Sequence, residues 1–477
     1  MDGLLSPDPL DISLEKNGHR GPPLMASDDC LNILLLGATG VGKSTFINAF
    51  VNYLTFDTLN NALNGEMQTL IYSTFSTSTE DDEETEIVVG VPDDGEGTST
   101  GNMGGSDTQS CRAYTISNGD RTVRLIDTPG IGDTRGFDQD VKNMKGIISY
   151  ISNYMVLNGV CILLKPNEER LTPSLKYCIV QLLAHLHNDV ANNITFCFTN
   201  ARSTMFHAGA TLNILKALLR EFQQTSAVEL SKDTIYYFDS EAFRFLACVK
   251  NNIKFSNNEQ QIYDSSWRQS TNESIRLINH IRSLSPHLIE KTVCLNKVRE
   301  MLTTVEIPLA SMSSVREMEQ TVNAAALFAN FLAQHSIVVY HLGVEEYLED
   351  QIKKTRTLPG AKHYRKQTLE GLEQSRESYS HQVSTYKKRC KPGNESSVIN
   401  VEDIRNMLQQ LYALKENGKM LKEMMDEAEE GYRNAANQEE VSYIVPMRPQ
   451  RHISDNRWLI FFWVGYILIS IWSKYVK

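Results

Sequence analysis

Eight consecutive residues near the start of the chain have the types and the spacing of a phosphate-binding loop. From Gly37 to Ser44 they fit the pattern G-x(4)-G-K-S/T, between a strand-like apolar run and a stretch with helical spacing. Glycines there let backbone N–H groups converge on phosphate oxygens, and a helix N-terminus adds its dipole. Lys43 is expected to reach the β- and γ-phosphates of a nucleotide, and Ser44 to ligate Mg²⁺. The predicted nucleotide-binding residues here are Gly37, Gly40, Gly42, Lys43, Ser44 and Thr45.

A second group of candidates lies downstream, in the sequence DTPG from Asp127 to Gly130, which follows a strand-like run. An aspartate at the carboxyl end of a strand suits an Mg²⁺-holding role, and Gly130 can offer its N–H to a γ-phosphate. Thr108 ends a polar stretch, and its hydroxyl can close on Mg²⁺ when a γ-phosphate is present. The alternatives are a plain Pro-Gly turn and an ordinary surface threonine. We predict Ser44, Thr108 and Asp127 as metal ligands, and Lys43, Thr108 and Gly130 as catalytic residues.

These candidates need a fold that carries them to one place, and the neighbouring sequence predicts one. Between residues 31 and 285, short β-branched or aromatic runs alternate with stretches of helical spacing, which is typical of βαβ units. We expect an α/β fold with a mainly parallel sheet. The strand-like runs are 31–36, 123–126, 160–164, 194–198 and 234–238, and the helical patterns include 44–54, 173–186 and 212–222.

Two segments depart from this alternation. Residues 1–29 contain four prolines and no sustained periodicity, which indicates a flexible leader. Residues 73–107 are rich in Ser, Thr, Asp, Glu and Gly, which predicts a mobile acidic insertion with a short strand at 87–89.

The motifs GATGVGKST, SDTQSC and RLIDTPGIGDT together resemble the septin-like P-loop GTPases, a group that holds septins, AIG-type immune-associated GTPases and chloroplast translocon receptors. The resemblance implies a G domain over 30–285, with Mg²⁺ and GTP as its cofactor and ligand. It also implies a homodimer formed across the nucleotide face, and many members of the group sit on membranes.

The base-reading motif departs from the pattern of this group. GTPases place N/T-K-x-D after a late strand, but here the strand-like run at 194–198 leads into Thr199-Asn200-Ala201-Arg202. Asn200 can hydrogen-bond a purine edge, whereas Arg202 cannot accept the N–H groups of guanine. Asp239, in the turn after 234–238, is a candidate for the missing carboxylate. GTP is therefore implied by the resemblance, and ATP stays open.

The residues expected to hydrolyse the nucleotide depart as well. Ile131 stands where a water-positioning glutamine is common, so we expect slow turnover. Arg135, in the same loop, is a candidate to act in cis or across a dimer. Three functions remain open: a slow GTPase switch stimulated by dimerisation, a GTP-binding scaffold with negligible hydrolysis, and a P-loop ATPase or kinase.

Residues 286–445 read as a helical or coiled-coil region. It contains two stretches of heptad-like apolar spacing, called seams here, one from Leu369 to Tyr386 and one from Ile404 to Ala428. The helix-breaking sequence Lys-Pro-Gly-Asn at 391–394 separates them. We expect two long helices that fold back as a hairpin within one chain, because Arg376 and Gly418 at seam positions suit a dimeric coiled coil poorly.

The last segment predicts a membrane anchor at 457–476. Its uncharged run of 15 residues, 458–472, spans about 22 Å, short of a hydrocarbon core of about 30 Å. Lys474 must therefore snorkel to extend the span. A buried core helix and an interfacial helix are the alternatives. A tail anchor leaves residues 1–457 in the cytosol, on the endoplasmic reticulum or the mitochondrial outer membrane.

Composition limits the remaining choices. Asp and Glu number 58 against 47 Lys and Arg, a net charge of −11, which argues against a nucleic-acid partner. The eight cysteines are scattered without a C-x-x-C pair, which favours buried free thiols over a metal site.

Overall fold

The computed structural model describes residues 30–78, 84–91, 108, 110–118, 121–132, 136–166, 172–221, 228–340, 342–357, 362–390, 398–434 and 445–446. The predicted leader at 1–29, the predicted anchor at 457–476 and Arg135 lie outside these residues.

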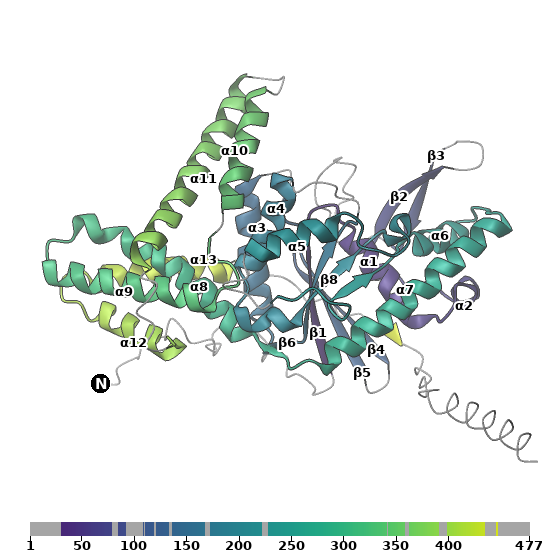
Figure 1. The fold of residues 1–477 in the computed structure, drawn as a ribbon, viewed down its shortest axis with the longest axis horizontal. Coiled ribbons are helices and arrows are strands. Elements are labelled where there is room, and N and C mark those ends of the chain that lie inside the picture. Colours follow the sequence, from purple (N-terminus) through teal and green to yellow (C-terminus); the bar gives the residue numbers. More distant parts are fainter. Residues whose placement is uncertain are drawn as a thin grey trace, which may run out of the picture.

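A seven-stranded sheet forms the centre of the structure (Figure 1), in the order β11-β4-β5-β1-β7-β8-β9. Strand β1 pairs in parallel with both β5 and β7. Among the described strand pairs of this sheet, the pair β4–β5 is the only antiparallel one. The prediction of an α/β fold with a mainly parallel sheet is therefore confirmed. The strands are β1 (Cys30–Gly37), β4 (Arg112–Asn118), β5 (Arg121–Asp127), β7 (Gly159–Leu164), β8 (Ile194–Phe198), β9 (Ile235–Tyr237) and β11 (Val445–Pro446).

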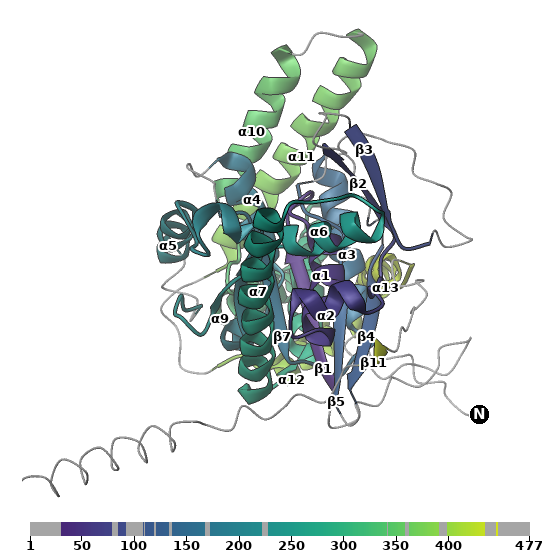
Figure 2. The same ribbon diagram turned by 90° about the vertical axis from the view of Figure 1, so that its right-hand side faces the viewer.

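Helices cover both faces of this sheet, which explains why its strands read as unbroken apolar runs. On β1, Ile33 and Leu35 face a core shared with α1 and α7, while Leu34 and Leu36 face a core shared with α3 and α4. Figure 2 shows α7 lying along the same side as α1. The helices of this α/β domain are α1 (Lys43–Thr55), α2 (Leu59–Asn64), α3 (Phe137–Ile151), α4 (Pro173–Ala184), α5 (Thr211–Glu221), α6 (Glu241–Lys250) and α7 (Asn257–Ser283).

The predicted insertion begins as a folded hairpin. Strand β2 (Ser73–Ser78) pairs antiparallel with β3 (Glu84–Val89), where the sequence indicated only a short strand at 87–89. The pair is held because Ile87 and Val89 are buried in a small core with α2 and α6. The remainder of the insertion, at 92–107, lies outside the described residues.

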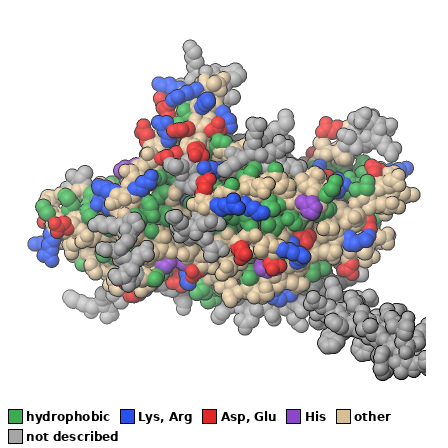
Figure 3. All heavy atoms as spheres, viewed as in Figure 1, with side chains coloured by type: hydrophobic (Ala, Val, Ile, Leu, Met, Phe, Trp, Pro, Cys, Tyr) green, Lys and Arg blue, Asp and Glu red, His purple; other side chains and the backbone are tan. Residues whose placement is uncertain are grey.

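Between 289 and 434, the residues that the structure describes are mainly helical, as predicted. Helices α8, α9, α12 and α13 share a core that includes Phe328 and Leu408. Helices α10 and α11 form a hairpin that projects from the body (Figure 1), and its surface carries charges of both signs (Figure 3). The bounds are α8 (Ile289–Glu306), α9 (Val315–His335), α10 (Leu342–Thr357), α11 (Lys362–Arg389), α12 (Val401–Tyr412) and α13 (Gly418–Asn434).

The pairing of these helices differs from the predicted pair of long helices. Helix α11 pairs with α10, and the second seam is split into α12 and α13, which pack on α9 and α8. The split is stabilised by Glu317 of α9, whose carboxylate accepts the N–H groups of Glu416 at 2.9 Å and Asn417 at 3.0 Å. Gly418 permits the turn, because a Cβ there would lie 2.4 Å from the carbonyl oxygen of Tyr412.

The helical region joins the α/β domain without a linker. The two-stranded pairing of β6 (Val156–Leu157) with β10 (His287–Leu288) ties the start of the region to the domain. Ile289, Val344 and Tyr347 belong to the same core as α3 and α4. Among the helices of the described residues, none is both long and apolar enough to cross a membrane. The anchor at 457–476 therefore stays a prediction.

Candidate functional site

The loop between β1 and α1 has the strand–loop–helix setting that its sequence pattern requires. The strand ends at Gly37 and the helix begins at Lys43. Gly40 and Gly42 have φ of 71° and 93°, a left-handed conformation that favours glycine. The loop can therefore curl around a phosphate without steric strain.

Lys43 is held inside this loop. Its side chain is buried, and Nζ donates to the carbonyl oxygens of Gly37 and Ala38, at 3.4 Å each. Burial lowers the pKa of Lys43, while the nearby carboxylate of Asp127 raises it. The ammonium is thus fixed where phosphate oxygens can replace carbonyls as its partners.

The three predicted metal ligands converge, although they come from three separate parts of the chain. Ser44 Oγ lies 3.4 Å from Thr108 Oγ1, and Thr108 Oγ1 donates to Asp127 Oδ2 at 3.3 Å. Asp127 is 2% exposed, and burial raises its pKa to about 6 even though Lys43 lowers it.

This donor set fits Mg²⁺, which prefers oxygen ligands and usually combines one or two protein carboxylates with water and phosphate oxygens. Within the described residues, no group of three or more His, Cys, Asp and Glu could hold a metal. Thr39, inside the loop, adds a buried hydroxyl oxygen that has no hydrogen-bond partner among the described residues. The loop therefore has a polar group that a phosphate could satisfy.

The DTPG segment lies directly on the phosphate-binding loop. Ile131 N donates to Gly37 O at 3.2 Å, and Thr39 N donates to Ile131 O at 2.9 Å. Gly130 is required by this close approach, since a Cβ would lie 2.5 Å from the hydroxyl oxygen of Thr39. Gly130 is thus placed beside the loop, as its predicted role requires.

Sequence reasoning missed Asp140, a buried carboxylate that holds this segment in place. Its two carboxylate oxygens accept from Gly132 N at 3.0 Å and 3.1 Å, and it lies in the first turn of α3. The available signal was an acidic residue at the start of the helix that follows DTPG.

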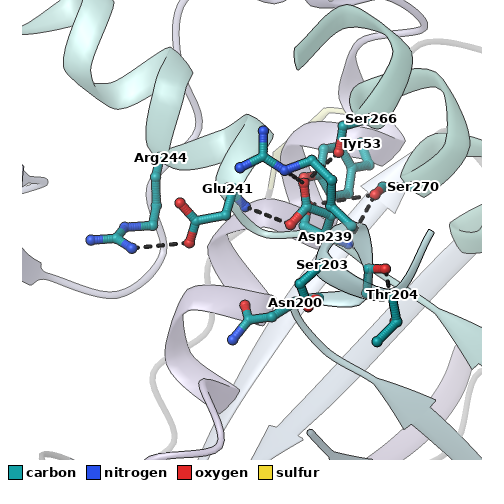
Figure 4. Close-up of polar contacts among 11 residues, drawn as sticks. Tyr53, Asn200, Ser203, Thr204, Asp239, Glu241, Arg244, Ser266 and Ser270 are labelled. Atoms are coloured by element: carbon teal, nitrogen blue, oxygen red, sulfur yellow. Dashed lines mark hydrogen bonds and ion pairs between the residues drawn. The ribbon is translucent and has the colours of Figure 1, made fainter. Parts of the chain in front are cut away.

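The two candidates for reading the base, Asn200 and Asp239, do not face each other. Asn200 is exposed and left-handed, with φ of 54°, and in Figure 4 its side chain points away from Asp239. Asp239 is fully buried. Its carboxylate accepts from Ser266 Oγ and from Glu241 N, the latter at 3.3 Å, and Arg202 Nε lies 3.5 Å away (Figure 4).

The structure therefore gives the Asp239 carboxylate internal partners instead of an exposed position for a base. Burial raises its pKa, whereas the hydrogen bond from Ser266 and the charge of Arg202 lower it. The partly exposed carboxylate in this turn is that of Glu241, which accepts from Arg244 at 2.9 Å.

No family model and no curated protein matches the chain. It is similar to the solved structure of Toc33 from Arabidopsis thaliana in complex with GDP and Mg²⁺, at 12% identity over 55% of this chain and 88% of that chain, with a TM-score of 0.31. A structure of the chloroplast translocon components atToc33 and psToc159 is similar at 15% identity over 54% and 85%, with a TM-score of 0.32. Bacterial elongation factor EF-Sec is similar at 14% identity over 49% and 29%, with a TM-score of 0.20. Scores this low support neither a family nor a function.

Proposed function

We propose that this protein is a Mg²⁺-dependent GTP-binding switch that hydrolyses its nucleotide slowly. The observation that carries the proposal is the convergence of Ser44, Thr108 and Asp127 beside Lys43. Such an arrangement positions phosphates and a metal, and positioning supplies most of the catalysis in phosphoryl transfer.

Nucleotide affinity of Lys43→Ala tests this proposal. The full-length chain in detergent is titrated with a fluorescent GTP analogue and Mg²⁺. Lys216→Ala, at an exposed position of α5, serves as the control. Because Lys43→Ala removes a charge-assisted contact to phosphate, we expect it to weaken the affinity by at least about tenfold, and Lys216→Ala to leave the affinity unchanged. Equal affinities in the two variants would exclude the proposed site.

The choice of base needs its own test, because Arg202 stands where GTPases place a carboxylate. Competition of GTP and ATP for the labelled analogue decides between the two nucleotides. Displacement by GTP at lower concentration supports the proposal, whereas preferential displacement by ATP supports a P-loop ATPase.

Slow hydrolysis is proposed because Ile131 replaces the water-positioning glutamine. A second copy of the chain is the proposed stimulator. Single-turnover hydrolysis at rising protein concentration separates the alternatives: a rising rate supports a dimer-stimulated GTPase, and a flat rate near zero supports a GTP-binding scaffold.

We further propose that residues 457–476 anchor the protein in the endoplasmic reticulum or the mitochondrial outer membrane, with the preceding residues in the cytosol. The support is the uncharged run at 458–472. Alkaline extraction of membranes that contain the full-length chain, or a chain ending at 456, tests it. Extraction of both chains would contradict the anchor.

A further inference from the structure

A continuous line of buried contacts leads from the phosphate-binding loop to the projecting hairpin. We propose that the α10–α11 hairpin is the output element of the nucleotide site, coupled to it through Asp140, Tyr177 and Tyr347. This inference rests on the proposed function, because it assigns a route to the switch.

The first step of the route is the attachment of the segment 127–132, which begins with DTPG, to α3. Gly132 N donates to the carboxylate of Asp140, and Asn143 Nδ2 donates to Gly130 O at 3.1 Å. Asp140 is 2% exposed. Leaving a buried charged group without its donor is costly, so α3 must follow a displacement of this segment or lose those bonds.

The second step crosses from α3 to α4. Tyr177 is fully buried, and its hydroxyl donates to Asp140 Oδ2 at 3.0 Å. A single carboxylate therefore binds the segment beside the phosphate site and a tyrosine of the next helix. Any shift in one partner changes the geometry of the other.

The third step enters the hairpin. The rings of Tyr177 and Tyr347 are stacked, with centroids 4.0 Å apart and an interplanar angle of 8°. Tyr347 lies in α10 and is buried, so no water layer separates the hairpin from α4. Beside the stack, Lys176 Nζ lies 3.3 Å from Glu346 Oε2.

Helix α11, the second helix of the hairpin, contacts α3 directly and is also attached to α8 at its C-terminal end. Ser375 Oγ of α11 donates to Asp138 Oδ1 at 3.1 Å. At the end of α11, Arg389 pairs with Glu306 of α8 through contacts of 2.5 Å and 3.2 Å. Thus α10 rests on α4 and α11 rests on α3, while the C-terminal end of α11, at the base of the hairpin, is fixed to α8. A shift of α3 or α4 therefore rotates the hairpin about that base.

Hydrogen–deuterium exchange of the full-length protein tests the coupling. Backbone exchange of 342–357 and 362–389 is compared in GDP and in a non-hydrolysable GTP analogue, for the native chain, Tyr177→Phe and Tyr154→Phe. Tyr177→Phe removes the bond to Asp140 and keeps the ring, and Tyr154→Phe removes another buried hydroxyl, whose oxygen lies 3.5 Å from that of Tyr150.

We expect exchange in the hairpin to differ at least about fivefold between the two nucleotides in the native chain and in Tyr154→Phe. The difference should become smaller in Tyr177→Phe, while that variant still binds nucleotide. Bound nucleotide with no difference in the native chain, or an undiminished difference in Tyr177→Phe, would overturn the coupling alone. Absence of nucleotide binding would overturn the proposed function and the coupling together.

A reciprocal measurement tests the same coupling from the hairpin, because linkage requires each site to act on the other. Asp138→Cys with Ser375→Cys allows a disulfide to fix α11 on α3. Oxidation should change the ratio of affinities for the GTP analogue and GDP, and reduction should restore it. An unchanged ratio in the oxidised protein would contradict the proposed route.

Discussion

At the residue scale, Asp127 is a predicted metal ligand in an environment that opposes its charge. Burial raises its pKa to about 6, and the charge of Lys43 is the largest effect that lowers this pKa. A protonated Asp127 cannot ligate Mg²⁺. The metal-dependent part of nucleotide binding should therefore be lost as the pH falls through this pKa.

We predict that Mg²⁺ strengthens binding of GTP more at pH 7.5 than at pH 5.5, where a larger fraction of Asp127 is protonated. Calorimetric titration with Mg²⁺ and with a chelator, at both pH values, measures the difference. Asp127→Asn should show a small metal effect at both pH values. A metal effect that does not change with pH in the native chain would contradict this role.

Gly130 supplies a second prediction, in which packing alone is changed. In Gly130→Ala the new Cβ would lie 2.5 Å to 2.7 Å from atoms of Thr39. We expect the free energy of unfolding to fall by about 1–3 kcal/mol, the usual cost of overpacking. Chemical denaturation measures it.

Gly146 offers the matched control, since it lies in helix α3 and a Cβ there would meet nothing within 4 Å. Gly146→Ala should raise the free energy of unfolding by up to about 1 kcal/mol, because alanine is the better helix former. Similar destabilisation in both variants would show that contact with Thr39 is not the cause.

The two halves of the site were unequally predictable. A contiguous pattern encodes the phosphate loop, and Asp127 follows a recognisable strand, so their positions could be predicted. The partners of Asp239 could not. Ser266 and Arg202 are remote from it in sequence, and the packing of α7 and of the turn after β8 brings them to its carboxylate.

At the scale of elements, the ion pair that attaches α11 to α8 makes a measurable contribution to the free energy of unfolding. The Arg389 and Glu306 side chains are only 11% and 12% exposed. Arg389→Ala leaves the carboxylate buried without its cation, so we expect a loss of about 3 kcal/mol in the free energy of unfolding.

The exposed pair Arg268 and Asp264 on α7 serves as the comparison, with 70% of the arginine side chain accessible. Arg268→Ala should cost less than about 1 kcal/mol. Thermal or chemical unfolding measures the loss of stability in both variants. Equal losses would contradict the larger stabilisation that we assign to the pair of Arg389 and Glu306.

The helices themselves could be predicted, but their partners could not. The heptad-like spacing at 404–428 continues through the turn before Gly418, so periodicity alone suggested one helix. The carboxylate of Glu317, about a hundred residues earlier, binds the backbone of that turn. Long-range contacts of this kind leave no local mark in a sequence.

At the scale of the whole molecule, three histidines lie at the junction of the α/β domain and the helical region. The ring of His187 is 5.1 Å from that of His335 and 6.1 Å from that of His287. Burial lowers the pKa of both His187 and His287 to about 4, although Asp189 raises each of them and Lys291 lowers them further.

The sign of the resulting pH dependence follows from these shifts. In the unfolded chain the same groups take up protons near pH 6.5, roughly, so the unfolded state binds more protons between that pH and about 4. Stability is full above pH 6.5, roughly, and falls as the pH approaches 4.

We therefore predict that the melting temperature falls between pH 7 and pH 4.5, and that His287→Gln falls less steeply over the same interval. Thermal melts in matched buffers measure both slopes. A native slope no steeper than that of His287→Gln would exclude His287 as a source. The sequence could not predict this junction, because His187, His287 and His335 belong to three separated segments.

The pairing of β11 with β4 bears on how the chain is made. Val445 lies opposite Ile116, so this edge of the central sheet gains its last strand only after the whole helical region has been synthesised. Until then β4 presents unpaired N–H and C=O groups, a template for strands of other chains. A nascent chain that already holds its phosphate loop is thus still vulnerable to aggregation. Pairing with β11 then covers Ile116 and Ser117 of β4, which shortens the part of this edge that can pair with another chain.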